Sequence, residues 1–231
     1  MVYRTILETI LIFSLSLMSV TCREARSRGI SRASSNAIAD SGSVQDQRVK
    51  DLITALSSTS GDQAAADLLS FANQSTAQRD SIVQSLIADV NKHDELNGTH
   101  AILFDTLIYW IRVTRVFDEL KATEALDVMI RCIHCGNEQT GSQNVRPAFS
   151  ALANLGSLAV PKLAAALRTH PDYYVRSQIA LCLGEIGGPE ATKALKQALR
   201  NERDKEVVHH IKWGLATIAG DPSKYWRGRT R

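Results

Sequence analysis

The sequence has few of the residues that mark sheets, tight turns or enzyme motifs. Aromatic residues make up 6% of the 231 positions, and there are 5 prolines and 4 cysteines. A chain with 44% apolar residues and so few aromatics and prolines is typical of an all-α domain with a sizeable core. It contains no Gly-rich phosphate loop, no Gly-x-Ser-x-Gly elbow and no paired catalytic carboxylates, so no common motif predicts an enzyme.

No apolar run has the length of a membrane-spanning helix. The run from Ile10 to Val20 has the length of a signal-peptide core, which makes residues 1–22 a candidate signal peptide, lipoprotein signal or retained anchor. Ser19 to Cys22 resembles a relaxed lipobox, so Cys22 is a lipidation candidate. Against export, four arginines follow the run closely. We expect an extracytoplasmic, periplasmic or membrane-anchored protein, with a cytoplasmic one as the alternative.

The net charge of +3 belongs to the two ends of the chain. Residues 23–32 and the tail 221–231 each carry +3, which leaves about −3 on the body between them. Residues 23–44 are rich in Ser, Arg and Gly without an apolar period, and we interpret them as a flexible tether. The body therefore lacks the charge of a nucleic-acid-binding protein, and we predict no nucleic-acid partner.

The best-formed segment runs from Asp172 to Glu202 and predicts two helices joined by a Gly187-Gly188-Pro189 corner. Its pattern recurs in the chain, which is the signature of a repeat protein. Thirty-two residues onward, the apolar stripe returns as Val207, Ile211, Leu215 and Ile218, and 31 residues back part of it returns as Leu152, Leu155 and Gly156.

Upstream, periodicity predicts helices from Gln47, from a cap at Asp62, over 76–90, over 99–116 and over 118–133. The segment 99–116 is the most apolar and should be the most buried. Residues 45–220 are therefore predicted to form an α-solenoid of about five helical hairpins, with the best repeats at 143–170, 171–202 and 204–220.

The repeat resembles the HEAT-like repeat of the phycobilin-lyase type, whose usual unit is VRxxAAxALGxLGxxxAxxxLxxxL. Val175-Arg176, Ala180, Leu183-Gly184, Ile186-Gly187 and Leu195 carry the match. The resemblance implies an armadillo-type superhelix that mostly binds proteins. Some relatives attach bilins or hydroxylate a protein lysine, but the His-Glu pairs of the hydroxylases do not occur here.

The sharpest chemical feature is Cys132-Ile133-His134-Cys135. A Cys-x-x-Cys pair is found in zinc sites, redox dithiols and local disulfides, and also as ordinary buried cysteine. Zinc needs about four ligands, and the chain holds no second such pair. We therefore keep Cys132, His134 and Cys135 as a disulfide or metal candidate and predict no cofactor.

Tyr173, Tyr174 and Arg176 start the first helix of the best repeat, and Tyr and Arg are favoured at protein interfaces. They are the predicted partner-binding residues, with the alternative that Arg176 bridges two repeats. The sequence thus predicts a non-catalytic scaffold for an unidentified protein partner, reaching the membrane only through its N-terminus. The alternatives are a bilin-lyase-like enzyme or chaperone that uses the groove, and a structural envelope lipoprotein.

Overall fold

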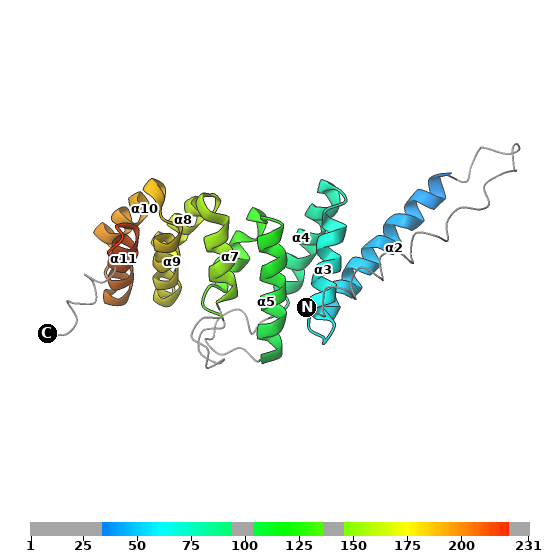
Figure 1. Ribbon diagram of the computed structural model, residues 1–231, viewed down its shortest axis with the longest axis horizontal. Helices are drawn as coiled ribbons and strands as arrows, with labels where there is room; N and C mark the ends of the chain where they lie inside the picture. The colour runs from blue at the N-terminus through cyan, green and yellow to red at the C-terminus, as the bar shows by residue number, and fades with distance from the viewer. Residues whose placement is uncertain (1–33, 94–103, 136–145, 222–231) are drawn as a thin grey trace, which may run out of the picture. The chain divides into compact units, whose positions relative to one another are not determined.

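The computed structural model describes residues 34–93, 104–135 and 146–221 (Figure 1). Contacts between residues divide the chain into two units, residues 1–42 and 43–231. The described part of the second unit is built from helices and contains no strand, which confirms the prediction of an all-α fold.

Most of the helices are short and follow one another through tight turns. The helices are α2 Ser34–Ala55, α3 Gly61–Ala72, α4 Thr76–Val90, α5 Phe104–Glu119, α6 Leu126–Arg131, α7 Pro147–Leu155, α8 Val160–Thr169, α9 Tyr173–Ile186, α10 Gly188–Asn201 and α11 Lys205–Ile218. Short 3-10 turns at Thr123–Ala125 (η2) and Gly156–Leu158 (η3) precede α6 and α8.

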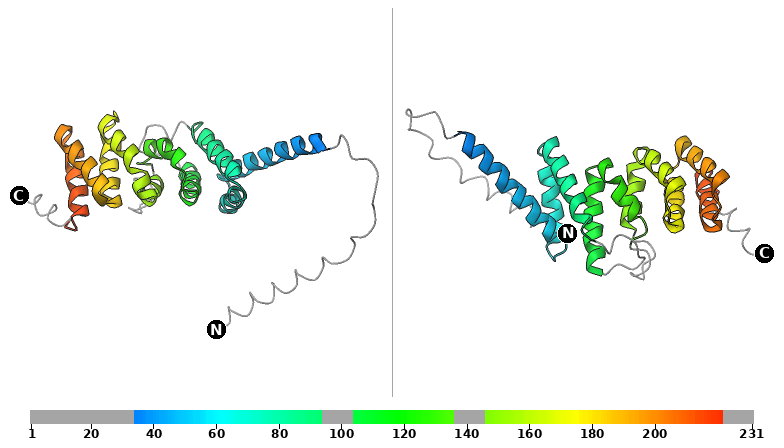
Figure 2. Two further views of the ribbon diagram at one scale, coloured as in Figure 1. Left: turned by 90° about the horizontal axis from the view of Figure 1, so that it is seen from above. Right: turned by 180° about the vertical axis from the view of Figure 1, so that it is seen from behind.

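Helices α5 to α11 form two layers of a solenoid. In one layer α5 packs on α7, α7 on α9 and α9 on α11, and in the other α6 packs on α8 and α8 on α10. Figures 1 and 2 show α5, α7, α9 and α11 side by side in chain order. Each helix of the first layer connects to one of the second, so the predicted α-solenoid of stacked hairpins is confirmed.

The repeat boundaries follow from local backbone chemistry. Asp172 and Asp204 each accept hydrogen bonds from the first free N–H groups of α9 and α11, at 2.8 Å from Tyr174 N and 2.9 Å from Glu206 N. Gly187 ends α9 with φ +70°, a conformation that favours glycine. The two caps thus fix where α9 and α11 begin, and Gly187 fixes where α9 ends and α10 follows.

The predicted helix over 118–133 was wrong. Helix α5 continues to Glu119, so Asp118 lies in its last turn and does not start a helix. Lys121 then adopts φ +48°, and Ala122 N donates to Phe117 O at 2.9 Å, which ends the helix in the manner of a glycine cap. Helix α6 is consequently short.

Two further predictions near the N-terminus need correction. Helix α2 begins at Ser34, so the last part of the predicted tether is helical; no proline interrupts this stretch. Residues 23–33 lie outside the described residues. Asp62 is not the cap of α3, because the helix begins at Gly61 and the Asp62 carboxylate accepts hydrogen bonds from Arg112.

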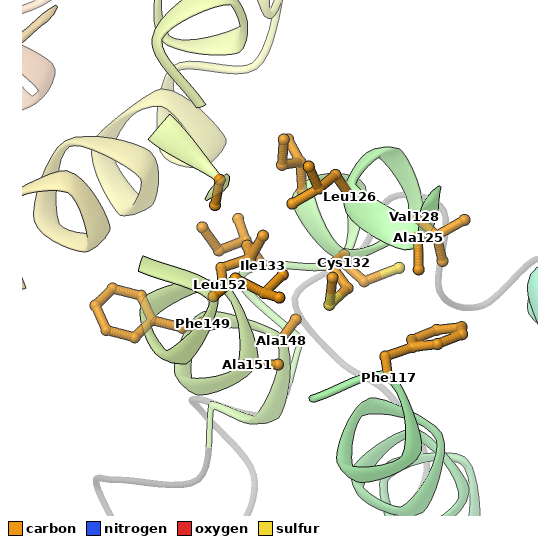
Figure 3. Packing of buried hydrophobic residues seen from close by; sticks show 14 of the residues in the cluster. Phe117, Ala125, Leu126, Val128, Cys132, Ile133, Ala148, Phe149, Ala151 and Leu152 are labelled. Atoms are coloured by element: carbon orange, nitrogen blue, oxygen red, sulfur yellow. The ribbon is translucent and has the colours of Figure 1, made fainter. Parts of the chain in front are cut away.

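The core lies between the two layers, and α5 supplies its largest side chains. Trp110, Tyr109 and Phe117 are almost completely buried. Residues 99–103 of the segment 99–116 lie outside the described residues, so its place as the most buried segment stays a prediction. Figure 3 shows Phe117 of α5, Cys132 after α6 and residues of α7 in one apolar cluster. Burial of such surface is the main stabilising contribution to a repeat fold.

Across the described ranges, no single helix is both long and apolar enough to span a membrane. The pair Pro147–Leu158 and Val160–Thr169 reaches the required length and hydropathy only when joined, and the chain bends by 118° between its two halves. The apolar residues of this pair, including Leu152 and Leu163, belong to the core.

Candidate partner-binding groove

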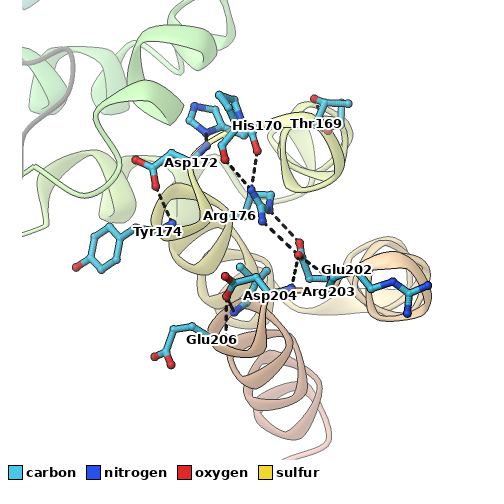
Figure 4. Close-up of polar contacts among 12 residues, drawn as sticks. Thr169, His170, Asp172, Tyr174, Arg176, Glu202, Arg203, Asp204 and Glu206 are labelled. Atoms are coloured by element: carbon cyan, nitrogen blue, oxygen red, sulfur yellow. Dashed lines mark hydrogen bonds and ion pairs between the residues drawn. The ribbon is translucent and has the colours of Figure 1, made fainter.

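Arg176, a predicted partner-binding residue, is bound inside the protein (Figure 4). Its guanidinium donates to Glu202 Oε2 at 2.9 Å and Oε1 at 3.2 Å, and to the carbonyl oxygens of His170 at 2.8 Å and Pro171 at 3.0 Å. The side chains of Arg176 and Glu202 are 15% and 11% exposed. Arg176 therefore bridges α9 to the turn after α10, which is the alternative role weighed from the sequence.

Glu202 is held by more than this arginine. Burial opposes ionisation, but hydrogen bonds from Arg176 and from the backbone N–H groups of Asp204 and Arg203 outweigh it and lower the pKa of Glu202. The carboxylate thus stays charged while it joins the ends of two repeats. Such a network sets the angle between repeats and leaves little of Arg176 for a partner.

The two tyrosines differ in their surroundings. Tyr173 is 51% exposed, whereas Tyr174 is half-buried and its ring lies edge-on to that of His134, with centroids 6.0 Å apart. Of the predicted surface patch, only Tyr173 therefore stands fully at the surface.

Cys132, His134 and Cys135 are all buried, the two thiols almost completely. Among the described cysteines, neither Cys132 nor Cys135 belongs to a disulfide. A hydrogen bond between the two thiols, assisted by Arg131, lowers the pKa of Cys132, while the same bond and burial raise the pKa of Cys135. Within the described ranges no group of three His, Cys, Asp or Glu side chains is placed to hold a metal ion. Burial keeps the thiols from a substrate, which weighs against a catalytic role. Cys22 lies outside the described residues.

The first layer of helices carries a groove that the sequence did not single out. It has a volume of ≈ 470 Å³ and crosses α7, α9 and α11. Its lining residues are Arg146, Phe149, Ser150, Leu181, Glu185, Trp213 and Thr217. A mixture of aromatic, aliphatic and charged groups in one groove is typical of a protein-binding surface.

The groove follows the repeat. Ser150, Leu181 and Trp213 are separated by 31 and 32 residues, the same steps that relate Leu152 to Leu183 and Leu183 to Leu215. All three thus occupy the same position on successive first helices. The repeat alignment contained a signal for these three positions. They lie outside the apolar stripe that forms the core, and yet their side chains become large and apolar toward the C-terminus.

Arg146 is the positively charged residue of the groove, and its guanidinium is partly covered by neighbouring side chains. It is half-buried, its guanidinium lies 3.9 Å from the centre of the Phe149 ring, and it donates to Gln178 Oε1 at 2.9 Å. Burial lowers the pKa of Arg146, and the nearby Cys182, Tyr174 and Glu185 act in the opposite direction. Among the residues that the structure describes, no carboxylate lies within ion-pair distance of it.

Comparison with known proteins agrees with this architecture. Residues 139–216 match the model of HEAT repeats, a range that includes nearly all of the groove. Within the curated proteins, the epoxyqueuosine reductases of Bacillus anthracis and Bacillus cereus are 35% identical over 75 residues, which is 32% of this chain and 20% of each relative. The chain therefore spans about a fifth of the length of the curated relatives that it matches. No solved structure gives a significant match.

The fold and the match together define the class of protein. Residues 139–216 are similar to HEAT repeats, and they lie in an all-α solenoid whose C-terminal repeats carry the groove.

Proposed function

We propose that the chain is a non-catalytic scaffold that binds a partner protein in the groove across α7, α9 and α11. The observation that carries this proposal is the row of equivalent positions at Ser150, Leu181 and Trp213, which line one continuous groove on three successive repeats. An extended segment laid across first helices would contact each repeat in turn, which is how solenoids bind their partners. Trp, Leu and Phe side chains supply the apolar anchors.

The groove supports protein binding better than it supports catalysis. Its charged residues, Arg146 and Glu185, are not joined by a nucleophile with an adjacent base, and Cys132 and Cys135 are buried. Export or lipidation through residues 1–22 stays a prediction, because that segment lies outside the described residues.

Site-specific photo-crosslinking tests the proposal. A photoreactive amino acid replaces exposed Ser150 in the groove, and in a matched control it replaces Lys196, which is exposed on α10 in the other layer. In extracts of the organism that makes the protein, we expect a protein adduct at position 150 that is absent at position 196. The adduct should weaken when Trp213 is changed to Ala in the same chain. Equal adducts at both positions, or none at 150, would contradict the proposal.

A further inference from the structure

Among the described residues, no carboxylate lies within ion-pair distance of Arg146 in the groove, and this property restricts the kind of segment that the groove accepts. Resting on the proposed function, we infer that the groove binds a partner segment in which an Asp or Glu side chain pairs with Arg146 and a neighbouring large apolar residue packs on Leu181 and Trp213.

An arginine has five N–H donors, and among the described residues Arg146 donates to Gln178 Oε1 at 2.9 Å. The Phe149 ring covers the guanidinium at 3.9 Å and removes water from it. A half-buried guanidinium with unused donors is best satisfied by a carboxylate, which accepts two parallel hydrogen bonds from it.

Arg146 is the N-cap of α7, and its side chain makes no capping hydrogen bond to the helix. Because an arginine has no acceptor, the first turn of α7 lacks the oxygen that Asp172 and Asp204 give to α9 and α11. The positive end of α7 adds to the charge of Arg146, so an anion is favoured at this end of the groove.

The charges in the groove favour a carboxylate over a phosphate. Phosphate recognition uses clusters of arginines, whereas this groove has one arginine and, on the neighbouring repeat, Glu185. A dianion would be repelled by Glu185, and a single carboxylate balances Arg146 alone. Leu181 and Trp213 continue the groove beyond Arg146, which leaves a place for a large apolar side chain beside the acidic one.

Selection from a random linear peptide library displayed on phage tests this inference with the 231-residue chain. Wild-type protein should enrich peptides with Asp or Glu next to an aromatic or large aliphatic residue. The same selection on Arg146→Glu should enrich Lys or Arg at that place. Because displayed peptides are fused at their C-termini, enrichment of an acidic position reports a side chain and not a terminal carboxylate.

Binding of one selected peptide, synthesised with an amidated C-terminus, gives the quantitative test. Arg146→Gln should weaken its affinity by about tenfold or more, and Arg146→Lys, which keeps the charge, should weaken it less. Far-UV circular dichroism and thermal unfolding establish that each variant is folded. Trp213→Ala serves as the control that removes the apolar part of the groove and leaves Arg146 in place.

The outcomes separate the two proposals. If Trp213→Ala and Leu181→Arg both abolish binding of the selected peptides, but Arg146→Gln binds them as tightly as wild type, the groove binds peptide segments and the inferred preference for an acidic residue is wrong. If the folded Leu181→Arg variant binds the selected peptides as tightly as wild type does, the peptides bind outside the groove. That result overturns the inference together with the proposed function.

Discussion

Gly184 of α9 and Gly214 of α11 face each other at the closest approach between these helices. A Cβ atom on Gly184 would lie 2.5 Å from the Gly214 Cα, and one on Gly214 would lie 2.7 Å from the Ala180 carbonyl oxygen. Both contacts are with backbone, which cannot turn aside as a flexible side chain can. The two glycines therefore set the spacing of the last two first-layer helices, and with it the spacing of Leu181 and Trp213 in the groove.

Gly184→Ala should destabilise the protein, although alanine is the better helix former by about 1 kcal/mol. Overpacking against backbone costs about 1–3 kcal/mol, so we expect a net loss of the free energy of unfolding, measured by urea denaturation. Gly214→Ala should behave similarly. Lys212→Ala, at an exposed position of α11, is the matched control and should change little. A Gly184→Ala protein as stable as wild type would show that α9 and α11 can separate freely.

Arg176→Ala should cost about 3 kcal/mol of the free energy of unfolding, because it removes the cation that pairs with the Glu202 carboxylate and the donor to two carbonyl oxygens. Denaturant unfolding of Arg176→Ala, Glu202→Ala and the double variant measures the coupling between the two side chains. Arg168→Ala is the control, since Arg168 is exposed beside the same turn. Equal effects of the two arginine substitutions would contradict the bridging role.

The Arg176–Glu202 contact also predicts a dependence on pH. The pKa of Glu202 is lowered in the folded protein, so its carboxylate stabilises the fold above the unfolded pKa of about 4.3. That stabilisation is lost as the pH falls through the lower folded pKa. We expect the stability difference between wild type and Glu202→Gln to be constant near neutral pH and to shrink in acid. A difference that does not change as the pH falls would be evidence against the predicted titration.

The sequence predicts the fold because short-range patterns within each repeat determine the helices and turns of the solenoid. The stripe Val175, Ile179 and Leu183 recurs 32 residues later, and the capping residues Asp172 and Asp204 recur at the same step. Each repeat packs mainly on its neighbours, so a local pattern that recurs is enough to establish the architecture.

The groove and the bridges depend on relationships that the local pattern does not contain. Arg176 meets Glu202 across 26 residues, and the alignment alone left it either as a bridge or as a surface residue. The groove row changes in type from Ser150 to Leu181 to Trp213, so a search for identical residues passes over it. Equivalent positions whose residue type varies between repeats can therefore form the binding surface, whereas the positions that recur form the core.

Arg112, in the N-terminal half, also makes contacts between segments that are far apart in the sequence and that the local pattern does not predict. It is 9% exposed, and its guanidinium donates to the carbonyl oxygens of Leu56 and Ser58, each at 2.7 Å, and to both oxygens of Asp62. The hydrogen bond from Arg112 and then its charge, with a smaller contribution from the charge of Arg115, lower the pKa of Asp62. Helix α5 is thereby fastened to the turn between α2 and α3.

Arg112→Ala should consequently cost about 1–3 kcal/mol, because it leaves the buried Leu56 carbonyl oxygen without a donor and opens space next to Gly61. The matched control is Arg115→Ala on the same helix. Arg115 is 52% exposed and lies 3.9 Å from the same Asp62 carboxylate, so its loss should cost less than about 1 kcal/mol. Urea unfolding of both variants decides between burial and charge as the origin of the effect. Similar losses would mean that the ion pair with Asp62, and not the carbonyl contacts, holds α5 in place.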